Sequence, residues 1–125
     1  MSGRIKMKKS FLVLEDEPLI AMDLKYAFED AGHEAVTAVD NEEALACIDE
    51  HQLEGAILDV TLGRNQTCKP TANRLLEEGI PFILHTGDLD RVGEHLREIR
   101  APMIAKPRPA DEVVSSLLDL ISEKV

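Results

Sequence analysis

Five polar residues stand out because each follows a short apolar run of this 125-residue chain. They are Glu15, Asp16, Asp59, Thr86 and Lys106. Short apolar runs bounded by polar or turn residues are typical of buried strands in a parallel sheet. Since open α/β sheets bind ligands at the carboxyl ends of their strands, we expect these five side chains to meet at one edge of a sheet.

The types of these side chains predict an aspartyl-phosphate site. Three carboxylates within about 4–6 Å repel one another by about 4 kcal/mol per close pair at an effective dielectric of roughly 20. Mg²⁺ offsets such repulsion, binding one or two carboxylates and keeping positions for water and phosphate oxygens. Asp59 is then the nucleophile, Lys106 provides a cation for the phosphoryl group, and the Thr86 hydroxyl can donate to one of its oxygens.

An alternation of strand and helix patterns is expected to position these residues. Strands are predicted over residues 10–14, 34–38, 55–61, 81–85 and 101–105. Helices are predicted over residues 18–31, 41–51, 70–78, 90–99 and from 109 onward, and residues 62–67 are predicted to be a loop. Five βα units of this kind predict an α/β protein with a flavodoxin-like, doubly wound, five-stranded parallel sheet in the order 2-1-3-4-5.

Apolar spacing also predicts which helix positions face the core. The predicted positions include Ile20, Leu24, Ala27, Phe28 and Ala31 in the first helix, and Ala72, Leu75 and Leu76 in the third.

Length and composition fit a single domain over residues 10–125, preceded by a basic tail at 1–9 and followed by no output domain. No apolar stretch approaches the roughly 20 residues of a membrane span, and a net charge of −10 repels phosphate backbones. Neither a membrane nor a nucleic acid is therefore expected as a partner, and a cytoplasmic location is expected. Cys47 and Cys68 are expected to be free thiols.

The chain resembles the receiver domain of two-component response regulators over nearly its whole length. The matching segments are Leu14-Glu15-Asp16-Glu17-Pro18, Leu58-Asp59, Thr86-Gly87 and Lys106-Pro107, in the same order and after the corresponding strands. The resemblance implies that Asp59 is the phosphoacceptor and that Glu15 and Asp16 form an acidic pair for Mg²⁺. It also implies that the backbone carbonyl of Thr61 is a metal ligand, that Thr86 is the switch hydroxyl and that Lys106 pairs with the phosphate.

By the same resemblance, the function is that of a single-domain response regulator of bacterial signal transduction. A histidine kinase or a histidine phosphotransfer protein supplies the phosphoryl group, and the signal passes to an unidentified downstream protein. In this family the signalling surface usually involves the fourth helix, the fifth strand and the fifth helix. Such a protein is not an enzyme, although it assists its own phosphotransfer and dephosphorylation.

Three residues depart from the usual receiver pattern. Met103 replaces a Tyr or Phe that many receivers carry three residues before the lysine. Residues 79–83 and Thr86-Gly87 resemble a stand-alone subgroup whose strand-four sequence is roughly Phe-Ala-Thr-Gly, from which His85 and Asp88 differ. The charge of His85 can tune dephosphorylation near neutral pH if the ring flanks the phosphate. Asp88 can orient or repel an attacking water, or cap the next helix.

Other functions remain compatible with parts of this pattern. A small phosphohydrolase of the haloacid dehalogenase type also uses Asp, Mg²⁺ and Lys, but it carries a second Asp at the position of Thr61. An interaction module that is not phosphorylated is another alternative on the same fold. A flavodoxin is a third, although acidic residues replace the Ser/Thr-rich phosphate loop after the first strand.

Overall fold

A computed structural model describes residues 10–63, 65–87 and 99–123. Its centre is a five-stranded sheet in the order β2-β1-β3-β6-β7, and every neighbouring pair is parallel. The strands are β1 (Ser10–Leu14), β2 (Glu34–Ala38), β3 (Leu53–Asp59), β6 (Phe82–Thr86) and β7 (Met103–Ala105). Since β6 and β7 are the fourth and fifth strands of this sheet, the predicted order and the flavodoxin-like α/β fold are confirmed.

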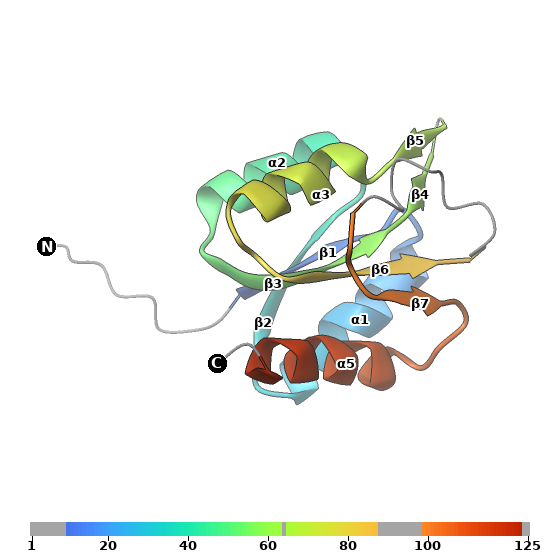
Figure 1. Cartoon of the computed structure of the whole chain (residues 1–125). Coiled ribbons are helices and arrows are strands. Elements are labelled where there is room, and N and C mark those ends of the chain that lie inside the picture. The colour runs from blue at the N-terminus through green and yellow to red at the C-terminus, as the bar shows by residue number, and fades with distance from the viewer. Residues whose placement is uncertain (1–9, 64, 88–98, 124–125) are drawn as a thin grey trace, which may run out of the picture.

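Helices cover both faces of the sheet (Figure 1). One face carries α1 (Pro18–Asp30) and α5 (Ala110–Glu123), and the other carries α2 (Asn41–Glu50) and α3 (Lys69–Glu77). No described helix is both long enough and apolar enough to cross a membrane. Residues 90–98 of the helix predicted over 90–99, the basic tail at 1–9 and Asp88 lie outside the described residues. Ile99 is described and lies in a bend.

A small hairpin replaces part of the loop predicted over 62–67. Strands β4 (Thr61–Leu62) and β5 (Gln66–Thr67) pair antiparallel in a separate two-stranded sheet beyond the end of β3 (Figure 1). Asn65 adopts a positive φ of 59° in the turn, a conformation that Asn tolerates better than most residues. Two-residue strands are too short to show an alternation pattern, so local sequence gave no indication of this pairing.

The hairpin is anchored by Asn41, the first residue of α2. The Asn41 amide Nδ2 donates to the carbonyl oxygen of Thr67 at 2.9 Å, and its Oδ1 accepts from the Thr71 hydroxyl at 2.7 Å. Because Thr67 pairs with Thr61 across the hairpin, one side chain connects α2, α3 and the segment that follows Asp59.

Two apolar cores lie on the two faces of the sheet. Alternate residues of the strands contribute to each, as the two-residue period of a strand requires. The core under α1 and α5 includes Phe11, Val13, Ile57, Ile83, Phe28 and Leu117. The core under α2 and α3 includes Leu12, Leu14, Leu58, Leu84, Ile48 and Leu75.

Two predicted core positions in the helices are wrong. Ala31 is exposed because α1 ends at Asp30 and Ala31 caps it. Leu76 is 52% exposed, since Thr71, Ala72 and Leu75 form the buried stripe of the nine-residue α3. Short helices bury a narrow stripe, so one residue beside it can stay in solvent.

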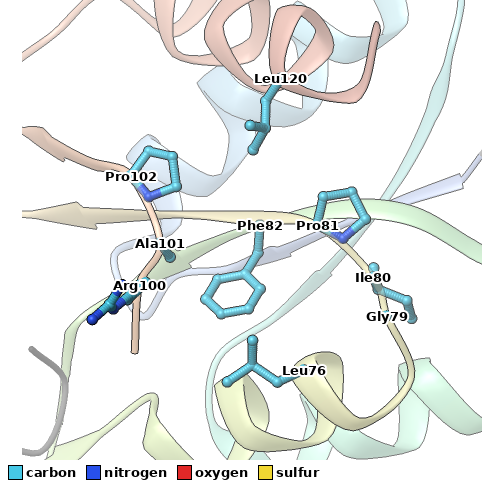
Figure 2. A pocket seen from close by; sticks show the side chains of 9 residues that line it. All are labelled: Leu76, Gly79, Ile80, Pro81, Phe82, Arg100, Ala101, Pro102 and Leu120. Atoms are coloured by element: carbon cyan, nitrogen blue, oxygen red, sulfur yellow. The ribbon is translucent and has the colours of Figure 1, made fainter. Parts of the chain in front are cut away.

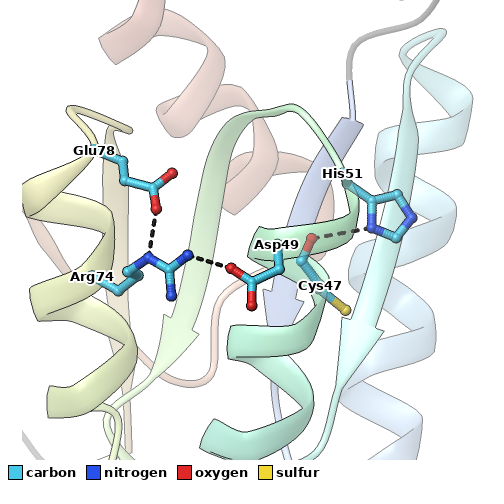
Figure 3. Close-up of polar contacts among 5 residues, drawn as sticks. All are labelled: Cys47, Asp49, His51, Arg74 and Glu78. Atoms are coloured by element: carbon cyan, nitrogen blue, oxygen red, sulfur yellow. Dashed lines mark hydrogen bonds and ion pairs between the residues drawn. The ribbon is translucent and has the colours of Figure 1, made fainter.

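Polar contacts on the outside of the molecule connect α2 with α3 (Figure 3). Arg74 of α3 pairs with Asp49 of α2 and with Glu78. His51 Nδ1 lies 3.1 Å from the carbonyl oxygen of Cys47 at the end of α2. The two cysteines are free thiols, as predicted.

Candidate functional site

Three carboxylates meet at the carboxyl edge of the sheet. Glu15 and Asp16 follow β1, and Asp59 is the last residue of the adjacent strand β3. One carboxylate oxygen from each of the three lies within 4.8 Å of the others. Glu15 is 1% exposed and Asp59 is 5% exposed, so two of these acidic groups are almost completely removed from water.

The Lys106 ammonium lies between two of these carboxylates. Its Nζ is 3.0 Å from Glu15 Oε1 and 3.4 Å from Asp59 Oδ1. Burial acts to lower the pKa of Lys106, but the hydrogen bond to Glu15 and the two negative charges raise it overall. Lys106 therefore stays cationic and partly neutralises the cluster.

Lys106 does not fully offset the cost of a negative charge on Asp59. Burial, followed by repulsion from Glu15, raises the pKa of Asp59 to about 8, and Lys106 only partly opposes the shift. Without a metal, the carboxyl group therefore holds a proton near neutral pH. Oxygen atoms at this spacing fit a hard divalent cation such as Mg²⁺, whose binding would displace that proton.

Thr86 and Thr61 lie beside this cluster. Thr86 ends β6, is 3% exposed, and its carbonyl oxygen accepts a 2.8 Å bond from the Lys106 amide. Thr61 begins β4 two residues after Asp59 and is exposed. The hairpin passes close to Asp16, because a Cβ on Gly63 would lie 3.8 Å from Asp16 Oδ2. The roles of the Thr86 hydroxyl and the Thr61 carbonyl stay predictions.

His85 is buried next to the cluster. It is 3% exposed and lies in register with Asp59 on the neighbouring strand. Burial lowers the pKa of His85 to about 4, and the positive charges of Lys106 and Arg108 add to the shift. The imidazole of the unphosphorylated protein is therefore neutral at pH 7, and a role of His85 in tuning dephosphorylation stays a prediction.

Known proteins are similar to this chain in sequence and in fold. No protein-family model matches the chain. The phyllosphere-induced regulator PhyR of Methylorubrum extorquens is 36% identical over 109 residues, which are 84% of this chain and 41% of that protein. SdrG from Sphingomonas melonis Fr1, solved in solution, is 32% identical with a TM-score of 0.76, over 94% of this chain and 99% of SdrG. The chain belongs to the receiver domains of response regulators.

More distant receivers share the fold. A CheY-like receiver domain from Methanospirillum hungatei JF-1 has a TM-score of 0.80 at 22% identity, over 94% of this chain and 96% of that one. The response regulator PhyR from Brucella abortus has a TM-score of 0.76 at 28% identity, over 94% of this chain and 51% of that one. This receiver domain thus spans about half or less of each PhyR protein it matches.

Met103, the residue that replaces the usual aromatic side chain, lies at the surface of this receiver domain. It begins β7, pairs with Leu84 of β6, and is 38% exposed. The methionine side chain is flexible and has no aromatic ring. The inward swing of a Tyr or Phe ring that the family resemblance implies therefore has no equivalent at this position.

Sequence reasoning missed two residues that bear on the site. Asn41 was interpreted only as part of a helix start, because its contacts lie 26 and 30 residues away along the chain. Arg108 carried no motif, yet its charge acts on the buried His85. Both roles depend on distant contacts, for which the local sequence contains no signal.

Proposed function

We propose that this receiver domain accepts a phosphoryl group on Asp59 in a Mg²⁺-dependent reaction. The observation that best supports the proposal is the meeting of three carboxylates within 4.8 Å, with the Lys106 ammonium 3.4 Å from Asp59. Glu15, Asp16 and Asp59 would hold the metal with the backbone carbonyl of Thr61. Bound Mg²⁺ would supply positive charge for the transferring phosphoryl oxygens.

The donor in this proposal is a phosphohistidine of a histidine kinase or a histidine phosphotransfer protein. A carboxylate oxygen of Asp59 forms the new O–P bond while the N–P bond of the donor breaks, and the bonding electrons stay with the histidine nitrogen. Lys106 turns its ammonium to a phosphoryl oxygen, and the Thr86 hydroxyl donates to another. Loss of the proton from Asp59 precedes attack, because the protonated carboxyl is a poor nucleophile.

The phosphorylated receiver would signal by changing its affinity for a protein partner. Residues 10–125 would form the receiver unit and 1–9 a basic tail, acting in the bacterial cytoplasm. The acidic net charge of −10 favours a protein partner over a nucleic acid.

Incubation with acetyl phosphate and Mg²⁺ tests this proposal. Intact mass measurement should show the gain of one phosphoryl group in the wild type and no gain in Asp59→Ala. Asp49→Ala is the matched control, because Asp49 is an exposed aspartate on α2, and it should be phosphorylated like the wild type. A gain that persists in Asp59→Ala would show that another residue is the acceptor.

Incubation with phosphomonoesters, alongside the acetyl phosphate experiment, separates the alternatives. A haloacid-dehalogenase-type phosphohydrolase would release phosphate from phosphomonoesters over many turnovers, whereas a receiver domain should not. An interaction module that is not phosphorylated would gain no mass under any of these conditions. The exposed Thr61 at the position of the second Asp of such hydrolases favours the receiver reaction.

A further inference from the structure

A pocket of about 220 Å³ lies on the α1 and α5 side of the sheet, next to the acidic cluster. Among the residues that line it are His85 from β6, Lys106 and Arg108 from the segment after β7, Leu24 and Asp23 from α1, and Ala110, which begins α5. The receiver reaction proposed above uses only Lys106 of this set.

His85, which lines the pocket, is a buried side chain without a hydrogen-bond partner among the described residues. Its side chain is almost fully buried, and neither ring nitrogen finds a hydrogen-bond partner among the described residues. Burying a polar group without a partner costs about 1–3 kcal/mol, so a buried and unpartnered imidazole needs an explanation. A half-turn of the ring about its Cβ–Cγ bond exchanges carbons with nitrogens, so the ring can present an N–H donor to a ligand in the pocket.

The charges around the pocket favour an anion. Lys106 and Arg108, both cationic, line the pocket together with His85. The pocket also adjoins the N-terminus of α5, a helix of 14 residues, whose dipole and amide groups attract negative charge.

Acidic groups on both the exposed and the buried side of the pocket oppose an anion. Asp23 lines the pocket and is exposed, Glu112 lies 3.8 Å from Arg108 Nη1, and Asp111 is in the first turn of α5. All three are exposed to water, which screens their charge more than that of a buried group. On the buried side, Glu15 Oε1 and Asp59 Oδ1 lie 3.0 Å and 3.4 Å from Lys106 Nζ and offset its charge. An anion in the pocket would therefore depend mainly on Arg108, the start of α5 and His85.

A second pocket of about 200 Å³ serves as a contrast (Figure 2). It lies at the opposite ends of β6 and β7, where the ring of Phe82 points toward Leu76 of α3 and Leu120 of α5 lies on the other side of the strand. Arg100 is the charged residue among those that line it, and His85 is not one of them. Nothing in this pocket indicates what fills it.

We propose that the pocket beside His85 binds a small oxyanion, held by Arg108, the start of α5 and the imidazole of His85. Phosphate and carboxylate share the required chemistry: a compact negative charge with oxygen acceptors. The proposal goes beyond phosphorylation of Asp59, because it needs neither Mg²⁺ nor an acceptor carboxylate.

Titration of the metal-free full chain with inorganic phosphate, and separately with acetate, tests the proposal by NMR. The ring protons of His85 and the amide of Ala110 should shift along a saturating curve with at least one anion, and not with chloride at equal ionic strength. Saturation with only one of the two identifies a phosphate or a carboxylate as the ligand class. The absence of saturation with both would overturn the proposal.

Variants locate the binding. Arg108→Ala should weaken the affinity about tenfold, the usual value of a charge-assisted hydrogen bond, whereas Arg100→Ala should leave it unchanged. His85→Phe keeps a buried ring, removes both nitrogens and should also weaken binding. Asp23→Asn should strengthen it. Equal affinities in Arg108→Ala and the wild type would contradict the proposed site.

Asp59→Ala distinguishes this pocket from the phosphoryl-acceptor site. It should abolish phosphorylation by acetyl phosphate and retain anion binding, because Asp59 does not line the pocket. Loss of binding in Asp59→Ala would place the anion at the acidic cluster and overturn the proposal, while leaving the proposed receiver function intact.

Discussion

At the scale of residues, Asp59 and His85 illustrate how burial acts on neighbouring groups of opposite charge type. Burial disfavours the charged form of each, so the pKa of Asp59 rises to about 8 and that of His85 falls to about 4. The metal-free protein therefore holds two neutral groups side by side at pH 7. In the proposed phosphoryl transfer, a bound cation would have to displace the proton of Asp59.

We predict that the stability of the metal-free protein falls as pH rises from about 6.5 to about 8. A raised pKa in the folded state stabilises the protein at low pH, and this contribution is lost as pH rises through the folded pKa of Asp59. His85 acts in the opposite direction, because its depressed pKa costs stability only as pH falls from 6.5 to about 4. Asp59 therefore dominates the upper window.

Thermal unfolding across this window measures the effect. The wild type should lose on the order of 1 kcal/mol, or a few °C in Tm. Asp59→Asn, which has no titrating carboxyl, should show a much flatter profile. An equal slope in both proteins would contradict the raised pKa.

Much of the residue-scale site was predictable, and the reason is geometric. Glu15, Asp59 and Lys106 follow strands whose ends must meet once a parallel sheet is predicted. The sequence placed His85 at the end of the fourth strand and left open whether its side chain is packed or half-exposed. Its burial depends on packing between α1 and α5, which no local pattern encodes.

At the scale of elements, Asn41 holds the β4–β5 hairpin against α2 and α3. Asn41→Ala should cost about 1–3 kcal/mol, because the buried Thr71 hydroxyl loses its acceptor. It should also weaken Mg²⁺ binding, since the hairpin carries the carbonyl of Thr61.

Chemical denaturation and Mg²⁺ titration check these two effects. Asn73→Ala is the matched control, because Asn73 is an exposed asparagine on α3, and it should change both quantities little. Unchanged Mg²⁺ affinity in Asn41→Ala would show that the hairpin does not support the metal site.

Helix α5 packs directly on the backbone of β3 at Gly55. A Cβ added there would lie 3.0 Å from Ile121 Cδ1 and 3.3 Å from the carbonyl oxygen of Pro81. Gly55→Ala should therefore lower the free energy of unfolding by about 1–3 kcal/mol through overpacking. Gly87→Ala, which meets no atom within 4 Å, should change it by less than about 0.5 kcal/mol in denaturant melts. A similar effect of both substitutions would contradict close packing at Gly55.

Strands and helices long enough to show a hydrophobic pattern were predictable from the sequence. The two-residue strands β4 and β5 were not. The bounds of β1 and β2 match the predicted ranges. The apolar run of β1 ends at Glu15, and β2 lies between the Gly32 stop of the first helix and the helix start at Asp40-Asn41. Strand β3 begins and ends two residues earlier than predicted, since Val60 and Thr61 continue the apolar and β-branched pattern into the hairpin. The β4–β5 pairing depends on Asn41, far away in the sequence.

At the scale of the whole molecule, stability should depend on divalent cations. Folding brings the three carboxylates of the acidic cluster together, so a cation that they hold stabilises the folded state over the unfolded chain. Mg²⁺ at ten times its Kd should add about 1.4 kcal/mol, raising Tm by roughly 4–8 °C. Asp59→Ala should respond little, and sodium chloride at equal ionic strength serves as the control. Equal Tm shifts in both proteins would remove the proposed metal site.

Lys106 contacts Asp59 and also lines the pocket beside His85, and this double position couples two equilibria. A phosphoryl group that attracts the ammonium would lower the positive potential in the pocket, so a bound anion would hold less tightly. Linkage is reciprocal, and an anion in the pocket must disfavour the phosphorylated form by the same factor. The concentration of a dissolved anion would then enter the signalling balance of the receiver, alongside the supply of phosphoryl groups.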